Sequence, residues 1–219
     1  MKPYIDYTLL KPESTIQDFI NLCKEAKKYT EVIRGVCVLP DQNIIKICLQ
    51  ELDGSSIFVC AVNNFPLGRG GERIKYEEAI LAKEYGVKEI DTVINTGALR
   101  EGNFNLVLKE LKAVTSVFHG TTKVILETGH KWYTEDLIKK ATELVAKSGA
   151  FCVKTSTGFI ENIPVENKVE HVKWMHEAVP ELVKKVAGGI KTKEQVKLFN
   201  FIPEDKLIFG ASSKFWLEE

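Results

Sequence analysis

Long hydrophobic runs, clustered histidines and an excess of charge of either sign are all missing from this sequence. No apolar run approaches the about 20 residues that a membrane-spanning helix needs, and no apolar signal segment follows the first residues. The 30 basic residues balance 30 acidic ones, without a basic stripe or an acidic tail. We therefore expect neither a membrane protein nor a partner among nucleic acids or anionic membranes.

Cysteines and histidines are few and are poorly placed for metal binding. Five cysteines occur at irregular spacings, none as C-x-x-C and none grouped with one of the four histidines. His171 and His176 are five residues apart, which is poor spacing for two ligands on one helix. We expect free thiols, a cytoplasmic location, no metal and no other cofactor.

What the sequence does contain is a regular alternation of short β-branched runs with longer amphipathic stretches. The runs have the length and composition of strands, and the stretches have the apolar spacing of helices. Strands are expected at 4–9, 34–39, 57–62, 89–94, 123–127, 151–155, 182–187 and 207–210. Helices are expected at 15–29, 43–52, 75–85, 104–118, 134–148, 165–178 and 192–199.

Eight strands alternating with helices over 219 residues favour an α/β protein, a (β/α)₈ TIM barrel. No linker or low-complexity tract divides the chain, so residues 1–219 are expected to form a single domain. A doubly wound open sheet is the competing architecture. The barrel is preferred because no glycine-rich nucleotide-binding motif follows the early strands.

The carboxyl ends of the strands are where either architecture places its functional site. Alternation along the strands puts Lys154, Lys185 and Asp91 on inward-facing positions near these ends. A solvated lysine, or a buried ion pair with Asp91, is the plain structural explanation for each lysine alone. Two inward lysines and one aspartate together favour chemistry.

The chemistry that fits two adjacent lysines is amine nucleophilic catalysis. A free lysine has a pKa of about 10.4, so only about one in 2,500 is neutral at pH 7. A second ammonium about 4 Å away, at an effective dielectric constant of about 20, disfavours the charged form by about 4 kcal/mol. One lysine can therefore activate the other, and Asp91 is suited to moving a proton or to steadying the second lysine.

Glycine and serine residues follow the last three strands. Such loops present backbone N–H groups and hydroxyls without bulky side chains, which is how a barrel holds a small phosphate. An ordinary tight turn explains any one of them, but three on adjacent strand ends favour a phosphate site. The residues concerned are Gly158, Gly188, Gly189, Gly210, Ser212 and Ser213.

Motifs from one end of the chain to the other support a more specific hypothesis. They are I-D-Y-T-L-L-K-P at 5–12, V-C-V-L-P at 36–40, F-P-L-G at 65–68, E-I-D-T-V-I-N at 89–95, K-V-I-L-E-T at 123–128, K-T-S-T-G at 154–158, K-V-A-G-G at 185–189 and G-A-S-S at 210–213. In these stretches the chain resembles the deoxyribose-phosphate aldolases. The pair K-T-S-T-G and K-x-A-G-G on successive strands is the most specific part.

The resemblance implies reversible cleavage of 2-deoxy-D-ribose 5-phosphate to acetaldehyde and D-glyceraldehyde 3-phosphate. It implies that Lys154 forms the Schiff base, that Lys185 is the activating second lysine and that Asp91 is the acid/base aspartate. The supporting polar residues would be Asp6, Thr8 and Thr157, and the glycine and serine loops would contact phosphate. It also implies no metal, and a homodimer or a larger homo-oligomer.

The sequence departs from the family pattern at four places, one of which is Lys191, where arginine is common. Lys184 stands where an apolar residue is usual, so a shift of one residue would exchange it with Lys185. Phe159 follows Gly158 where some relatives carry a polar residue. The chain ends at 215–219 without the tyrosine-bearing tail of some relatives, which implies slower turnover but intact Schiff-base chemistry.

Two other functions fit the same residues. One is a different Schiff-base barrel aldolase, transaldolase-like or acting on a keto acid, which would use a ketone donor. The other is a non-catalytic sugar-phosphate binding protein, which has no use for an inward lysine pair. A metal-dependent aldolase is disfavoured by the scattered histidines.

Overall fold

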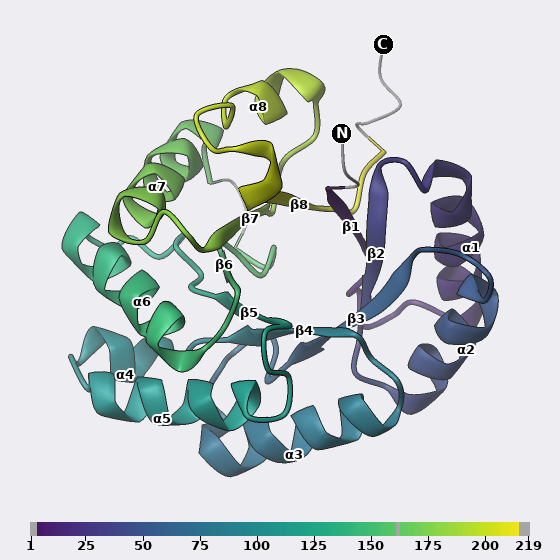
Figure 1. Ribbon diagram of the computed structural model, residues 1–219, viewed down its shortest axis with the longest axis horizontal. Coiled ribbons are helices and arrows are strands. Elements are labelled where there is room, and N and C mark those ends of the chain that lie inside the picture. Colours follow the sequence, from purple (N-terminus) through teal and green to yellow (C-terminus); the bar gives the residue numbers. More distant parts are fainter. Residues whose placement is uncertain (1–3, 161–162, 215–219) are drawn as a thin grey trace.

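Eight parallel strands close into a barrel in the computed structural model, which describes residues 4–160 and 163–214 (Figure 1). Each strand pairs with the next, and β8 pairs with β1 through Phe209 opposite Ile5. The closed barrel confirms the TIM-barrel prediction and excludes the open doubly wound sheet. The strands are β1 (Ile5–Thr8), β2 (Ile33–Val38), β3 (Phe58–Asn63), β4 (Glu89–Val93), β5 (Thr122–Ile125), β6 (Cys152–Lys154), β7 (Val183–Ala187) and β8 (Leu207–Ala211).

Helices form a ring outside the barrel (Figure 1). None of the helices in the described part of the chain combines the length and the apolar character needed to cross a membrane. They are α1 (Ile16–Ala26), α2 (Gln42–Leu52), α3 (Gly71–Glu84), α4 (Thr96–Arg100), α5 (Phe104–Thr115), α6 (Glu135–Ser148), α7 (Val165–Ala178) and α8 (Lys193–Lys197), with 3₁₀ turns at Lys27–Tyr29 and Glu204–Lys206.

Helix ends follow the capping residues that the sequence offers. The side chain of Thr134 accepts a hydrogen bond from the amide of Leu137 at the start of α6, and Gly149 ends that helix at a φ of 87°. Thr15 and Asp18 form a reciprocal capping box on α1. Local polar groups therefore set these boundaries, which is why the expected range 134–148 is nearly that of α6.

Two helical segments differ from the prediction. The short helix α4 was not expected; it begins where the side chain of Asn95 accepts a hydrogen bond from the amide of Ala98. Helix α3 starts at Gly71, four residues before the expected 75. Glycine has a low helix propensity, so Gly70 and Gly71 give no sequence signal for a helix start here. The amide of Gly70 donates to Oδ1 of Asn64, and a Cβ at Gly70 would lie 2.2 Å from Nδ2 of Asn64.

The barrel has an apolar outer layer and a largely charged interior. Side chains from the outward faces of the strands pack against the helices in one continuous buried cluster. A smaller apolar group, Leu10, Cys37, Cys60 and Val62, forms a separate buried cluster. Most fully buried ionic side chains instead come from inward strand positions, so the apolar layer must hold the barrel closed around them.

We expect Gly149→Ala to lower the free energy of unfolding by about 1 kcal/mol. A Cβ at this position meets no heavy atom within 4 Å, so the cost comes from the positive φ and not from a clash. Urea denaturation measures the change. Gly149→Asn is the control and should cost less, since asparagine tolerates this backbone conformation; equal losses in both variants would contradict the explanation.

Candidate active site

Three lysines converge on one aspartate inside the barrel. Oδ2 of Asp91, on β4, accepts hydrogen bonds from Nζ of Lys154 on β6 and from Nζ of Lys185 on β7, each at 2.8 Å. Oδ1 of Asp91 accepts one from Nζ of Lys123 on β5, also at 2.8 Å. All four side chains are buried, with Lys154 only 2% exposed. The structure thus brings together the three residues that the sequence singled out and adds Lys123.

Further ion pairs extend this cluster toward the other end of the barrel. Asp6 on β1 accepts from Lys185 and, at 2.9 Å, from Arg34 on β2. Glu89 on β4 pairs with Arg34 at 2.5 Å and with Lys123 at 2.7 Å. With every group ionised, the four cations and three carboxylates leave the cluster with one net positive charge.

Strand alternation and one glycine explain how these side chains share the interior. Glu89 and Asp91 are two residues apart on β4 and therefore point to the same side. On the neighbouring strand β8, Gly210 lies opposite Ala187, two residues beyond Lys185, and a Cβ at Gly210 would lie 3.2 Å from Cε of Lys185. The aliphatic part of the Lys185 side chain occupies the space that a side chain at position 210 would need. The absence of a side chain at Gly210 on β8 therefore makes room for Lys185 on β7.

The charge state of the cluster follows from burial and its partners. Burial alone would raise the pKa of Asp91, but Lys123, Lys154 and Lys185 outweigh it and hold that pKa well below its usual value. Burial likewise opposes ionisation of Asp6, whose pKa Lys185, Lys123 and Arg34 lower. The pKa of Lys185 is raised, because Asp6 and Asp91 overcome the effect of its burial. Asp91 is therefore held as a carboxylate and Lys185 as an ammonium.

Lys184 lies on the opposite face of β7 from this cluster. Its Nζ donates to the carbonyl oxygens of Val179 at 2.8 Å, Pro180 at 3.0 Å and Leu182 at 2.7 Å, all before or at the start of the strand. Lys185, not Lys184, is therefore the inward lysine of the pair. The alternation along this strand predicts the same choice.

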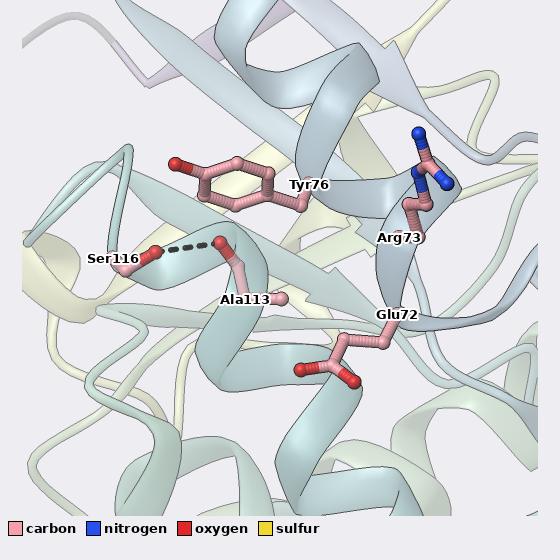
Figure 2. Close-up of a pocket in the computed structure, with 5 residues that line it drawn as sticks. All are labelled: Glu72, Arg73, Tyr76, Ala113 and Ser116. Carbon is pink, nitrogen blue, oxygen red and sulfur yellow. Dashed lines mark hydrogen bonds between the residues drawn. The ribbon is translucent and has the colours of Figure 1, made fainter.

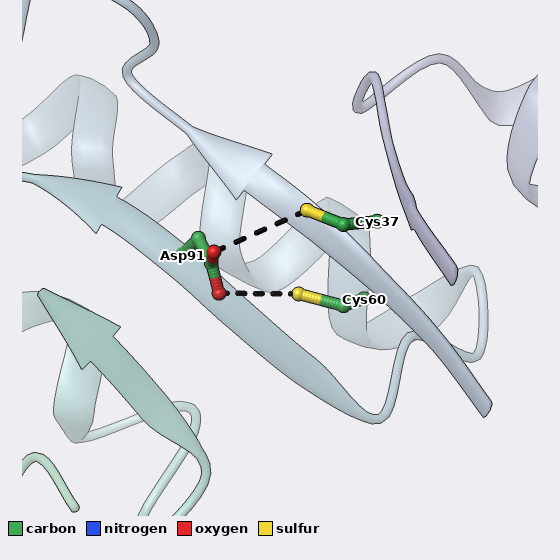
Figure 3. Close-up of side chains that lie close together, drawn as sticks. All are labelled: Cys37, Cys60 and Asp91. Atoms are coloured by element: carbon green, nitrogen blue, oxygen red, sulfur yellow. Dashed lines mark hydrogen bonds between the residues drawn. The ribbon is translucent and has the colours of Figure 1, made fainter. Parts of the chain in front are cut away.

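Two cysteines also contact the carboxylate of Asp91 (Figure 3). Sγ of Cys60 lies 3.2 Å from Oδ1 of Asp91, and Sγ of Cys37 lies 4.0 Å from Oδ2. These three side chains place their ligand atoms within 4.8 Å of one another, close enough to share a metal ion. However, both oxygens of Asp91 accept from lysine ammonium groups, and a dication here would lie among them. The donor set therefore suits ammonium ions better than a metal.

A second polar group joins the loops after β5 and β6. Glu127, at a φ of 57°, accepts hydrogen bonds from the amide and the hydroxyl of Thr157. Because β5 ends at Ile125, this carboxylate lies beyond the strand that was expected to include it. The contact anchors the start of the loop that carries Gly158.

The other expected site residues differ in their surroundings. Gly158 and Gly188 lie close together, since a Cβ at Gly188 would be 3.4 Å from Cα of Gly158. The hydroxyl of Thr8 donates to the carbonyl oxygen of Asp6. Within the described residues it forms no hydrogen bond with the lysines of the cluster. Ser212 and Gly189 are exposed and Ser213 is half-buried. Residues 215–219, where the absent tyrosine-bearing tail was considered, lie outside the described residues.

Sequence reasoning missed four charged residues of the two groups. Lys123 was available to the same argument as Lys154, because it is a lysine within an apolar strand. Glu89 was available through its two-residue spacing from Asp91. Arg34, like Lys123 and Glu89, stood at the first position of an expected strand, where a charged side chain is ordinarily solvated, and Glu127 has a positive φ that alternation does not predict.

An open hollow on the outside of the barrel is a separate feature (Figure 2). Glu72, Arg73 and Tyr76 of α3 line it together with Ala113 and Ser116 at the end of α5. The hydroxyl of Ser116 donates to the carbonyl of Ala113, and Glu72 pairs with the exposed Lys109. None of its lining residues belongs to the buried cluster, so we place the candidate active site inside the barrel.

Comparison with known proteins identifies the family of this chain. The profile of the DeoC/LacD family aldolases matches residues 3–199. The chain belongs to this family.

Individual relatives cover nearly the whole chain. The deoxyribose-phosphate aldolase of Clostridium novyi is 38% identical over 222 residues, which cover 100% of this chain and 95% of the relative. That of Clostridium kluyveri is 40% identical over 200 residues, covering 90% and 88%. The tetrameric deoxyribose phosphate aldolase structure from Aeropyrum pernix has a TM-score of 0.78 at 26% identity and covers 95% of this chain and 85% of its own.

We expect Lys123→Met to lower the free energy of unfolding by about 3–5 kcal/mol. The substitution leaves Asp91 and Glu89 buried with one fewer cation, and removing one partner of a buried ion pair has a cost of this size. Urea denaturation measures it. Lys109→Met, which removes the exposed pair with Glu72, is the control and should change stability little. A similar small loss for Lys123→Met would show that the cluster tolerates the missing charge.

Stability should fall steeply in acid. The depressed pKa values of Asp6 and Asp91 add stability that is present above their unfolded pKa of about 3.9. That stability is lost as the pH falls toward the folded values, at up to about 1.4 kcal/mol per pH unit for each carboxylate. Urea midpoints between pH 5 and pH 2.5 measure the slope. Asp6→Asn should make it shallower; an unchanged slope would contradict the assignment.

Proposed function

We propose that this chain is a Schiff-base-forming aldolase that reversibly cleaves 2-deoxy-D-ribose 5-phosphate to acetaldehyde and D-glyceraldehyde 3-phosphate, with Lys154 as the nucleophile. The observation that carries the proposal is the shared oxygen of Asp91. Lys154 and Lys185 both donate to it at 2.8 Å, so two ammonium groups lie side by side in a buried site. The names of the Clostridium novyi and Clostridium kluyveri relatives support the choice of substrate.

In the proposed reaction the neutral amine of Lys154 adds to the aldehyde carbon of the open-chain sugar. Uptake of one proton and loss of water then give an iminium ion. A base removes the proton of the C3 hydroxyl, and the C2–C3 bond breaks as its electron pair moves toward the iminium nitrogen. Glyceraldehyde 3-phosphate leaves, and an enamine stays on Lys154. Protonation of the enamine at C2 and hydrolysis release acetaldehyde and restore the amine.

The contacts of Asp91 favour one of the two roles considered for it. Three lysines hold its pKa low, so a proton on this carboxylate is unstable while all three remain charged. Asp91 is better suited to steadying Lys185 and the cationic Schiff base on Lys154. In this role it orders both lysines, and protons move through water.

Two broader properties belong to the same proposal. We infer that residues 1–219 act as one catalytic domain and that the protein works as a homo-oligomer in the cytoplasm. The description of the Aeropyrum pernix relative as a tetramer supports an oligomer. All five cysteines are buried and unpaired, as expected where thiols stay reduced.

Reductive trapping with acetaldehyde and borohydride, without added metal, should give an ethyl adduct concentrated on Lys154. Peptide mass spectrometry locates the adduct, and the other lysines serve as internal controls. Lys154→Ala should abolish this adduct and lower kcat by at least about 10³-fold, because the covalent route is lost.

Each alternative has its own result in this experiment. Trapping by dihydroxyacetone or pyruvate, but not by acetaldehyde, would indicate a transaldolase-like or keto-acid enzyme. An adduct centred on Lys185 would keep the chemistry and overturn the roles. Only scattered surface labelling, with sugar phosphate still bound by Lys154→Ala, would indicate a binding protein.

A further inference from the structure

A buried lysine outside the main cluster lies behind the loop that follows β6. Lys168, in the first turn of α7, is only 3% exposed. Its Nζ donates to the hydroxyl of Ser156 at 3.2 Å. Within residues 4–160 and 163–214, Lys168 forms no ion pair. The hydrogen-bond partner of its ammonium group in this part of the chain is a neutral hydroxyl.

Lys168 begins a hydrogen-bonded chain that reaches the next strand. The hydroxyl of Ser156 donates to Oγ1 of Thr155 at 3.2 Å. Thr155 in turn donates to the carbonyl oxygen of Ala187 and accepts from the amide of Ala187 at 3.1 Å. The chain ties α7 to the ends of β6 and β7, so the charge of Lys168 is held at the place where both glycine loops begin.

The two glycine loops meet at Ser156. A Cβ at Gly188 would lie 3.4 Å from Cα of Gly158 and 3.5 Å from Cβ of Ser156. Both glycines have positive φ, 93° for Gly158 and 74° for Gly188. Such turns expose backbone N–H groups to an anion, and Lys168 lies within hydrogen-bond distance of the side chain between them.

Other side chains near these loops supply less charge to the same point. Phe159, directly after Gly158, is 52% exposed, and its ring packs edge-on against Phe65 at 5.3 Å. Lys214, after β8, pairs with Glu25 of α1 at 2.8 Å. Lys191, after the glycines that follow β7, is exposed. Lys168 is thus the buried cation that the described structure places against the glycine loops.

A buried ammonium group whose hydrogen-bond partner is neutral destabilises the protein unless an anion binds beside it and balances its charge. Burial lowers the pKa of Lys168, and the carboxylate of Glu127 only partly opposes this effect. The oxygens of Glu127 are hydrogen-bonded to Thr157. A phosphate dianion at the glycine loops would supply the missing charge.

We propose that Lys168 is the phosphate-binding cation of the active site, and that it reaches the sugar phosphate beside Ser156, Gly158 and Gly188. This proposal rests on the proposed function for the identity of the sugar. It assigns selection of phosphorylated over unphosphorylated sugar to a residue on α7. The alternative is that Lys168 only fastens α7 to the barrel, in which case both sugars would be affected alike.

The test compares Lys168→Met with wild type on 2-deoxyribose 5-phosphate and on 2-deoxyribose. We expect the KM for the phosphorylated sugar to rise about 10- to 100-fold, since a charge-assisted hydrogen bond is lost. The kcat/KM for 2-deoxyribose should stay within about twofold. Lys168→Arg should bring the KM for the phosphorylated sugar most of the way back to the wild-type value. Lys173→Met, which changes an exposed lysine on the same helix, should have the wild-type KM for both sugars.

Three results would overturn the proposal. They are equal losses on both sugars, an unchanged KM for the phosphorylated sugar, or a loss that follows Lys191→Met instead of Lys168→Met. Should Lys168→Met not fold, Lys168→Gln is tested in its place.

Wild-type protein offers an independent measurement with inorganic phosphate. Burial and the charge of Lys168 lower the pKa of His171 to about 4. Inorganic phosphate, a monoanion at the pH where His171 titrates, should on binding at Lys168 raise the pKa of His171 in an NMR titration. An unmoved pKa under saturating phosphate would count against the proposal. This measurement needs no turnover. If phosphate binding depends on Lys168 but the protein is inactive on both sugars, the proposed aldolase function is wrong. The assignment of Lys168 as a phosphate-binding residue would still hold.

Discussion

The carboxylate of Asp91 is the interaction on which the interior of this barrel depends. It accepts hydrogen bonds from Lys123, Lys154 and Lys185, which reach it from three consecutive strands. Without that carboxylate the three ammonium groups would repel one another in a space with little water to screen them. The same contact that makes the lysines tolerable also fixes their positions, so folding and alignment of the candidate nucleophile have one physical origin.

Burying such a cluster is expensive, and the outer layer of the barrel must offset it. Removing several ions from water costs several kcal/mol for each, and ion pairing returns only part of that cost. The continuous apolar cluster between strands and helices supplies the opposing free energy. This division agrees with the alternation on β4, where Ile90 belongs to the apolar cluster while Glu89 and Asp91 belong to the charged one.

Sequence alone predicted the architecture and the central residues because both depend on local rules. Period-two alternation identified Lys154, Lys185 and Asp91, and the capping residues Thr134 and Gly149 set the limits of α6. It did not predict Lys168, because a helical lysine one turn from a helix start normally faces water. It also could not show that Gly210 makes room for Lys185, since that role depends on a contact between neighbouring strands.

The surplus of one positive charge refines the idea that one lysine simply activates another. Lys185 is held as an ammonium by Asp6 and Asp91, so it does not compete as a nucleophile. When the cluster releases one proton, its charge becomes balanced, and the repulsion among the remaining cations diminishes. Formation of an iminium ion then returns one positive charge to the position opposite Asp91. The surroundings that accept the resting ammonium therefore also fit the covalent intermediate, so little reorganisation is needed during the reaction.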